Sequence, residues 1–273
     1  MADAPRTTAE TIREAAMAEF TGYDEGTPCW VDLMCPDLEQ AKHFYEPVFG
    51  WEYTDTGPEY GNYTMATKNG KVIAGLAPSQ PGQPAPPAWV TYLWADDADA
   101  VAGRVVKADG NVFMGPMDVP GAGRMALALD STGAAFGIWQ GREHRGAQLA
   151  NEPGSFTWNE NLNDDPGKAR AFYERVFGYT YERLPDWPGE YHTFKVKDQV
   201  RGGVGAKPAQ IPPGTPNFWN TYFSVADTDE TVAAATRAGG SVGLEPMDTP
   251  VGRMAVLMDP AGAQFSIISV PKG

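Results

Sequence analysis

Short stretches of alternating apolar and polar residues, each followed by a helical pattern, recur along the chain. The first stretch, Trp30 to Cys35, alternates and contains strand-forming residues. Asp37 follows it and is a typical N-cap for a helix that runs to about Phe49. Short apolar stretches separated by glycine-containing turns come next. The pattern predicts a strand, a helix and then three strands, a βαβββ module.

The same order of elements begins three more times. A strand over 89–94 is followed by Asp97 as the cap of a helix through Ala108, and three more strands follow. The order then recurs from Thr157 and from Phe218. Four βαβββ modules place the chain in the α+β class.

The second half of the chain repeats the residues of the first at a nearly constant spacing. Trp30 and Asp37 recur 128 positions later as Trp158 and Asp165, and Tyr92 recurs 130 positions later as Tyr222. A constant offset over more than one hundred residues is typical of the duplication of a whole domain. We therefore expect an N-terminal extension over 1–26, a first domain over 27–140, a linker over 141–154 and a second domain over 155–273.

The N-terminal extension has a helical pattern of its own. Thr7 and Glu10 have the spacing of a capping box, and apolar residues share one face as far as Phe20. We expect a helix over 7–20 that packs on the fold or on a partner subunit, or that covers a cleft.

Composition narrows the range of partners. The chain has 35 acidic and 21 basic residues in 273, a net charge of −14, which disfavours binding to nucleic acid and to anionic membranes. No apolar run approaches the length of a membrane span, and residues 1–20 carry four acidic side chains and no apolar core. We expect a cytoplasmic protein, monomeric or homodimeric, that binds a small molecule.

The repeated motifs resemble those of the vicinal oxygen chelate superfamily, the glyoxalase, bleomycin-resistance and extradiol dioxygenase group. They are Asp37-Leu-Glu-x-Ala-x-x-Phe44-Tyr45-x-x-Val-Phe-Gly50, its repeat over 165–178, and the turns Asp130-x-x-Gly133 and Asp259-x-x-Gly262. The sequence is most similar to two-domain actinobacterial members that are often labelled hydroxylases or glyoxalase-like antigens. The resemblance implies two tandem glyoxalase-like domains, each with two modules curled around a cleft.

The resemblance also points to positions where metal-using members carry ligands. These positions start the first strand of a module and lie in its last strand, and the usual ligands are His, Gln and Glu. In this chain the corresponding residues lack strong ligands for a divalent cation, since they are Trp30, Val90, Gly137, Trp158, Asn220 and Ser266. We therefore expect no catalytic metal and no cofactor.

Alternation along the strands predicts which side chains face each cleft. In the first domain they include Trp30, Asp32, Tyr92, Trp94 and Trp139. In the second they include Trp158, Glu160, Asn220, Tyr222, Gln264 and Ser266. Because the second set has more neutral hydrogen-bonding groups, we expect the ligand there, provided that modules of one domain pair with each other.

These side chains have two interpretations. In the functional one, tryptophan stacks on a flat or sugar-like ligand, and Asp32 or Glu160 accepts a hydrogen bond from it. In the structural one, the carboxylates are neutralised by Arg124 and Arg253 or hydrogen-bonded by tyrosine, and the tryptophans fill the core.

Two functions remain open at this point, and a third is least supported. The first is a metal-free protein that binds a small, partly aromatic or polyhydroxylated molecule. The second is a metal-independent lyase, isomerase or so-called hydroxylase of specialised metabolism or detoxification, with Glu160, Tyr222, Asp32 and Tyr92 as candidate acid–base groups. The third, a metal-dependent oxygenase or lyase, lacks its ligands.

Overall fold

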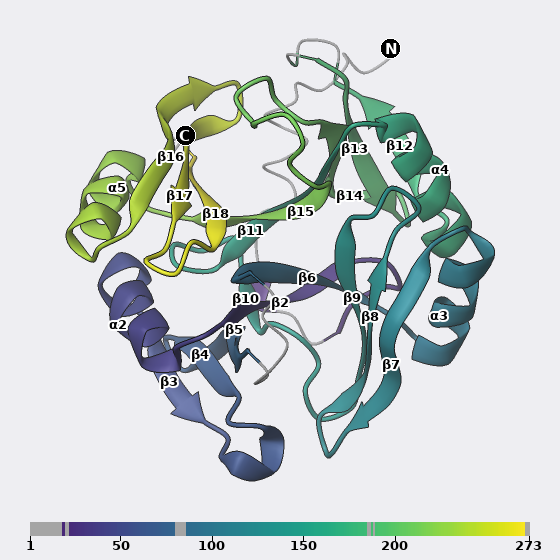
Figure 1. Cartoon of the computed structure of the whole chain (residues 1–273), viewed down its shortest axis with the longest axis horizontal. Coiled ribbons are helices and arrows are strands. Elements are labelled where there is room, and N and C mark those ends of the chain that lie inside the picture. Colours follow the sequence, from purple (N-terminus) through teal and green to yellow (C-terminus); the bar gives the residue numbers. More distant parts are fainter. Residues whose placement is uncertain (1–17, 20–21, 80–85, 185–186, 188, 271–273) are drawn as a thin grey trace, which may run out of the picture.

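Each half of the chain forms one mixed sheet of eight strands (Figure 1). The computed structural model describes residues 18–19, 22–79, 86–184, 187 and 189–270. In the first sheet the strand order is β3 (Glu52–Asp55), β4 (Thr64–Lys68), β5 (Lys71–Pro78), β2 (Pro28–Cys35), β6 (Ala88–Trp94), β9 (Ala135–Gly141), β8 (Gly123–Leu129) and β7 (Asn111–Val119).

The second sheet repeats this arrangement. Its order is β12 (Thr180–Arg183), β13 (Tyr191–Val196), β14 (Gln199–Ala206), β11 (Phe156–Asn163), β15 (Phe218–Ser224), β18 (Gln264–Ser269), β17 (Gly252–Met258) and β16 (Ser241–Thr249). In each sheet the first strands of two modules pair antiparallel at the centre, β2 with β6 and β11 with β15. Modules of the same half therefore pair with each other, and the predicted fold of four βαβββ modules is confirmed.

One helix follows the first strand of each module. The helices are α2 (Leu38–Phe49), α3 (Ala98–Lys107), α4 (Pro166–Phe177) and α5 (Thr228–Arg237), and a short 3₁₀ turn, η1, covers Pro58–Tyr60. Each α-helix begins after an aspartate whose side chain accepts from the backbone N–H three residues on, at Asp37, Asp97, Asp165 and Asp227. Because these carboxylates satisfy otherwise unpaired N–H groups, the four helix starts follow directly from the sequence.

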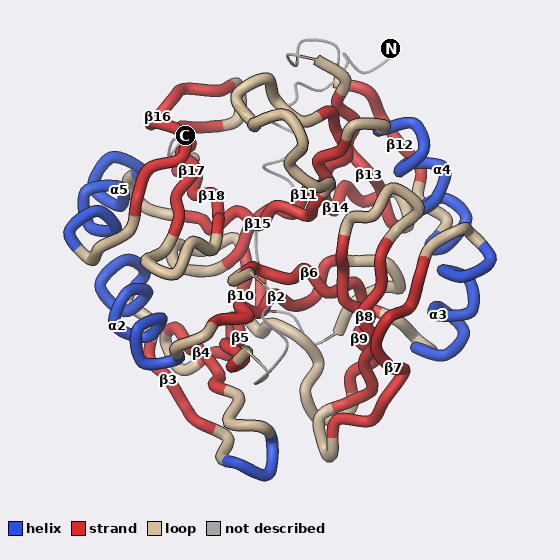
Figure 2. The backbone as a smooth tube through the Cα atoms, viewed as in Figure 1, coloured by secondary structure: helices blue, strands red, loops and turns tan. Residues whose placement is uncertain are grey.

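The helices pack in pairs that join the two halves. Figure 2 shows α2 beside α5 at one side of the molecule and α3 beside α4 at the other. Tyr45 of α2 packs on Phe265 of β18 with ring centroids 5.5 Å apart, and Tyr173 of α4 packs on Phe136 of β9 at 5.7 Å. The apolar core is thus shared between the halves.

The two sheets also meet through their central strands. Thr91 of β6 and Thr221 of β15 both donate to the side-chain oxygen of Asn159 on β11, at 3.0 and 3.1 Å. All three side chains are buried. This contact occupies the faces that carry odd-numbered residues of β6, β11 and β15, so Tyr92, Glu160 and Tyr222 belong to the opposite faces.

The N-terminal helix that we expected over 7–20 is not seen in the described residues. Residues 1–17 and 20–21 lie outside them, and Ala18–Glu19 form the two-residue strand β1, which pairs with β10 (Leu149–Ala150). For Ala18–Glu19 the helix prediction is wrong, because these two backbones pair with a strand of the segment between the halves. No helix in the described part of the chain is long and apolar enough to cross a membrane.

Candidate functional site

The strand register places most of the predicted side chains of each half on one face of its sheet, which we call the inner face. Trp30 lies opposite Tyr92 and Asp32 opposite Val90 across β2 and β6, and Tyr92 lies beside Gly137 of β9. In the second sheet, Trp158 lies opposite Tyr222, Glu160 lies opposite Asn220, and Tyr222 lies beside Ser266. The alternation expected from the sequence therefore agrees with the observed register.

The second inner face carries a closed hydrogen-bond network around Glu160. Tyr191 donates to Oε2 at 2.6 Å, Tyr222 donates to Oε1 at 2.9 Å, and the Asn220 amide donates to Oε1 at 3.2 Å. Burial raises the pKa of Glu160, and these three donors partly oppose the rise. Asn220 also bonds Ser266 at 3.0 Å, and Trp158 donates to Tyr191 at 2.9 Å. We call these six residues, Trp158, Glu160, Tyr191, Asn220, Tyr222 and Ser266, the second cluster.

The first inner face carries an open network around Asp32. Tyr63 donates to Oδ2 at 3.1 Å and receives a bond from Trp30 Nε1 at 2.9 Å. Oδ1 is buried and has no hydrogen-bond partner among the described residues. Tyr92 lies near enough to favour the ionised carboxylate but makes no hydrogen bond of normal geometry to Oδ1. We call Trp30, Asp32, Tyr63 and Tyr92 the first cluster.

Desolvation is the main influence on the Asp32 carboxyl. The residue is 5% exposed, and its burial raises its pKa from 3.8 to about 7, with Tyr63 and Tyr92 opposing the rise. A group with such a pKa can give up or take a proton at neutral pH. The Asp32 carboxyl therefore differs from that of a surface aspartate in the pH range over which it takes up a proton.

Arginine does not neutralise either carboxylate. Arg124 pairs with Asp99 at 2.7 Å and Arg253 pairs with Asp229 at 2.6 Å, both on the outer helical side of the sheets. The expectation of Arg124 and Arg253 as partners of Asp32 and Glu160 is wrong, because these long side chains reach the first turns of α3 and α5 instead. Tyrosine hydrogen bonds, the other partner that we considered, are the ones present.

Three predicted residues lie at the margins of the clusters. Trp139 packs against His144 of the segment between the halves, with ring centroids 5.4 Å apart, and donates to its backbone carbonyl at 2.9 Å. Trp94 donates to Asp96 at the end of its own strand, and Gln264 is exposed at the start of β18. Trp94 and Gln264 thus take no part in the two hydrogen-bond networks.

Sequence reasoning missed the two tyrosines that hold the carboxylates. Tyr63 and Tyr191 are 128 positions apart, the same offset that relates Trp30 to Trp158. Each approaches the carboxylate of its half from the side of the sheet formed by β4 or β13, across one intervening strand. The repeat offset could have identified the pair, whereas alternation along the first strand could not.

The same tyrosines cover the backbone where a metal ligand would have to stand. A Cβ atom added at Gly75 would lie 1.8 Å from the Tyr63 hydroxyl oxygen, and one at Gly203 would lie 2.0 Å from that of Tyr191. At Gly137 a Cβ would lie 2.1 Å from the Tyr92 ring. No group of three or more His, Cys, Asp or Glu side chains suited to a metal ion occurs in the described ranges. The residues present do not fit the ligand set of a divalent cation.

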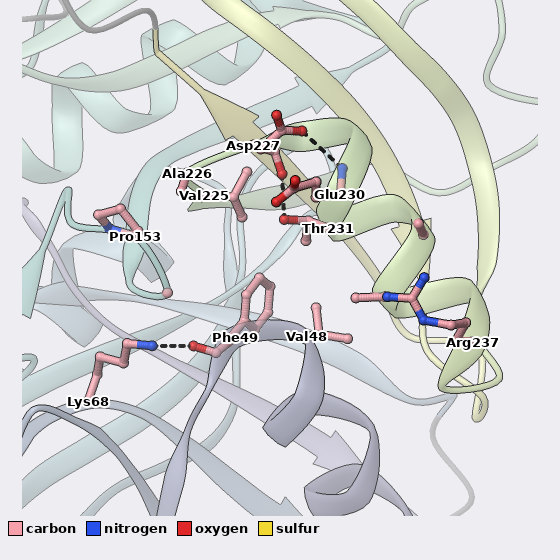
Figure 3. Close-up of a pocket in the computed structure, with 13 residues that line it drawn as sticks. Val48, Phe49, Lys68, Pro153, Val225, Ala226, Asp227, Glu230, Thr231 and Arg237 are labelled. Carbon is pink, nitrogen blue, oxygen red and sulfur yellow. Dashed lines mark hydrogen bonds between the residues drawn. The ribbon is translucent and has the colours of Figure 1, made fainter.

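A groove of about 540 Å³ opens elsewhere, between the end of α2 and the start of α5 (Figure 3). Two of its charged side chains are paired, since Lys68 donates to the Phe49 carbonyl at 2.6 Å and Asp227 accepts from the Glu230 backbone at 2.9 Å. None of the residues that we predicted to bind a ligand lines this groove. The groove lies over the helix pair and not over either cluster.

Comparison with known proteins identifies the family. The profile of the Glyoxalase/Bleomycin resistance protein/Dioxygenase superfamily matches residues 29–138 and 162–267. The chain is 47% identical over 258 residues to the Mycobacterium tuberculosis protein named "Putative glyoxylase CFP32", covering 92% of this chain and 98% of that one. It is 38% identical to "Anthracycline biosynthesis protein DauV" of Streptomyces sp. (strain C5), over 92% of this chain and 96% of that one.

Solved structures show the same fold at low identity. The Mn(II)-bound glyoxalase of Novosphingobium aromaticivorans superposes with a TM-score of 0.61 at 16% identity, over 90% of this chain and 83% of that one. The 2,2',3-trihydroxybiphenyl 1,2-dioxygenase of Sphingomonas wittichii gives a TM-score of 0.63 at 16% identity, over 90% and 91%. With its duplicated βαβββ modules and a matching profile in each half, the chain belongs to the glyoxalase/bleomycin resistance protein/dioxygenase superfamily.

Proposed function

We propose that the protein binds a small, partly aromatic or polyhydroxylated molecule on an inner face of its sheets, without a metal ion. The observation that carries the proposal is the repeated cluster of aromatic side chains around a buried carboxylate, Asp32 in one half and Glu160 in the other. Apolar walls with a few oriented polar groups are typical of small-molecule sites. The remaining candidates of the two sets, including Trp94 and Gln264, would contact the outer parts of such a ligand.

The names of relatives support a planar aromatic ligand. Two Streptomyces proteins, 38% and 37% identical to this chain, are named for anthracycline biosynthesis. Anthracyclines are flat, polycyclic and hydroxylated, and tryptophan and tyrosine rings stack well on such molecules. We therefore take an anthracycline as the first probe of binding.

A metal-independent lyase or isomerase is a second candidate function. The specific observation in its favour is the pKa of Asp32, which burial raises to about 7, near the value at which a carboxyl both accepts and returns a proton at neutral pH. Glu160, Tyr222 and Tyr92 would then act as hydrogen-bond donors or proton carriers beside a bound substrate. A time course of probe conversion during the binding assay separates this function from binding alone.

Native mass spectrometry of the untagged protein from its own host, together with titration of an anthracycline by tryptophan fluorescence, tests the proposal. We expect a retained organic molecule, or saturable quenching with one ligand per chain. Elemental analysis of the same sample checks the absence of a metal. A protein that carries nothing and shows no saturable quenching, or that holds near-stoichiometric iron, zinc, nickel or manganese at an inner face, contradicts the proposal.

A further inference from the structure

The two inner faces have diverged since the duplication, and the difference concerns how fully each carboxylate is hydrogen-bonded. Both oxygens of Glu160 accept hydrogen bonds, whereas Oδ1 of Asp32 is buried without a partner in the described structure. A buried carboxylate oxygen without a donor costs free energy, and this cost is removed when a ligand supplies the donor.

Differences between corresponding residues of the two halves explain why Oδ1 of Asp32 has no hydrogen-bond partner. The aspartate side chain is one methylene shorter than that of glutamate. Val90 stands where the second half has Asn220, and Gly137 stands where it has Ser266. Asn220 is a direct donor to Glu160, so the first half lacks this donor, and its carboxylate side chain is also shorter.

The neighbours of Asp32 in its row across the strands are more exposed than those of Glu160, whereas Trp30 is more buried than Trp158. Met65, Gly75, Asp32 and Val90 lie side by side across four strands, and both Met65 and Val90 are partly exposed. In the matching row of the second sheet, Thr193 and Asn220 are buried. Met34, two residues beyond Asp32, is likewise partly exposed, whereas Leu162 in the second half is buried. Methionine side chains adapt readily to flat apolar molecules.

We infer that the ligand site lies on the inner face of the first sheet, over Asp32 and between Met34, Met65 and Val90. It takes a planar apolar molecule that presents one hydroxyl or protonated amine to Oδ1. This inference rests on the proposed function and narrows it to one half and one class of ligand. The second cluster is then a structural network, which reverses the preference drawn from the sequence.

Binding should depend on pH because Asp32 accepts a hydrogen bond best when ionised. The titratable groups near it are Tyr63, immediately before β4, Tyr92 from β6 and Cys35 from its own strand, while β5 contributes Gly75; no cation pairs with Asp32 in the described residues. Burial raises the pKa of the carboxyl to about 7 in the free protein. Affinity for a hydroxyl donor therefore rises between pH 6 and pH 8.

The test uses matched variants and two probes, an anthracycline glycoside with an amino sugar and its aglycone, titrated against the full chain. Asp32→Asn is expected to weaken binding about ten- to one-hundredfold, more than Glu160→Gln does, and to abolish its pH dependence. Asp99→Asn, at the exposed start of α3, is the control and is expected to leave affinity within about twofold. Asp32→Glu keeps the charge but gives the side chain the length of Glu160, which Tyr222 bonds in the second half, and it is also expected to weaken binding at least about tenfold. A preference for the glycoside identifies the amine as the donor, and equal affinities identify the hydroxyl; either supports the inference.

The outcomes separate this inference from the proposed function. If the wild type binds and Glu160→Gln abolishes binding while Asp32→Asn does not, the assignment to the first sheet is wrong and small-molecule binding stands. If both variants bind as the wild type does, the assignment is again wrong. If the wild type binds neither probe and carries no host molecule, the proposed function itself fails. Circular dichroism and thermal unfolding of each variant confirm that a loss of binding is not a loss of fold.

Discussion

One methylene group separates Asp32 from Glu160, and on a rigid sheet this length decides which donors a carboxylate can reach. Glu160 extends far enough to bond Tyr191 and Tyr222 at once, while among the described residues the one hydrogen bond of normal geometry to Asp32 comes from Tyr63. Tyr92, Tyr191 and Tyr222 stand on strands of the two sheets, and Tyr63 immediately precedes β4. The difference in side-chain length therefore accompanies the difference in hydrogen bonding between the two halves.

The raised pKa of Asp32 makes a prediction for stability. The folded protein holds the proton between the unfolded value of 3.8 and the folded value of about 7, so this carboxyl lowers stability as pH rises through that range. Replacing Asp32 by Asn removes this destabilising contribution to the free energy of unfolding, which amounts to at most about 4 kcal/mol. In urea unfolding, Asp32→Asn should therefore compare more favourably with the wild type at pH 8 than at pH 5. An equal difference at both pH values contradicts this. Asp99→Asn is the control and should compare with the wild type equally at both pH values, because Arg124 lowers the pKa of the exposed Asp99, which is ionised throughout this range.

Glycine at position 75 leaves room for the Tyr63 ring. Gly75→Ala should destabilise the protein by about 1–3 kcal/mol, because the new methyl group overlaps the phenol of half-buried Tyr63, which Trp30 and Asp32 hold in place. Gly103→Ala is the control, since nothing lies within 4 Å of the added atom on α3, and helix propensity favours alanine there. Thermal unfolding of both variants checks the prediction, which fails if Gly75→Ala is no less stable than Gly103→Ala.

At the scale of the elements, the sequence patterns predicted the features that depend on residues close together in the chain. The aspartate caps placed all four helices, and alternation placed Asp32 and Glu160 on the inner faces. The hydrogen bonds from Tyr63 and Tyr191 could not be predicted in this way. Each joins residues 31 positions apart, and another strand of the sheet lies between them. The partners of Arg124 were missed for a related reason, since Asp99 meets it only when α3 packs on β8.

Contacts between elements of opposite halves also carry buried hydrogen bonds. Tyr45 of α2 donates to Asp259 before β18 and accepts from Trp89 of β6, both at 3.1 Å. Tyr45→Phe leaves two buried polar atoms without their partner and should cost about 1–3 kcal/mol in denaturant unfolding. Tyr53→Phe removes a longer, partly buried bond of 3.3 Å to the Lys42 carbonyl and should cost less. A smaller loss for Tyr45→Phe than for Tyr53→Phe contradicts this account.

At the scale of the whole molecule, the duplication produced two sheets but not two separate cores. One core cluster contains Phe44, Tyr45 and Phe49 of α2 together with Phe223 and Phe265 of the second half. The other contains Phe136 of the first half together with Phe172, Tyr173 and Phe194 of the second. Repeats in a sequence reveal that two halves are alike, but not which of their apolar faces meet. Dividing the chain at 141–154 therefore separates the two sheets but not the apolar cores, which both halves share.

Shared cores predict that the halves fold together. Isolated residues 1–140 would expose the α2 face that packs against α5, and each large side chain exposed costs about 1.5–3 kcal/mol. Three such side chains approach the whole stability of a typical domain. The intact chain should therefore unfold in one cooperative transition by tryptophan fluorescence and circular dichroism alike, and a fragment of residues 1–140 should show no cooperative transition alone. Co-expression with residues 141–273 should restore it, whereas an isolated fragment with its own cooperative unfolding would show that each half is an independent folding unit.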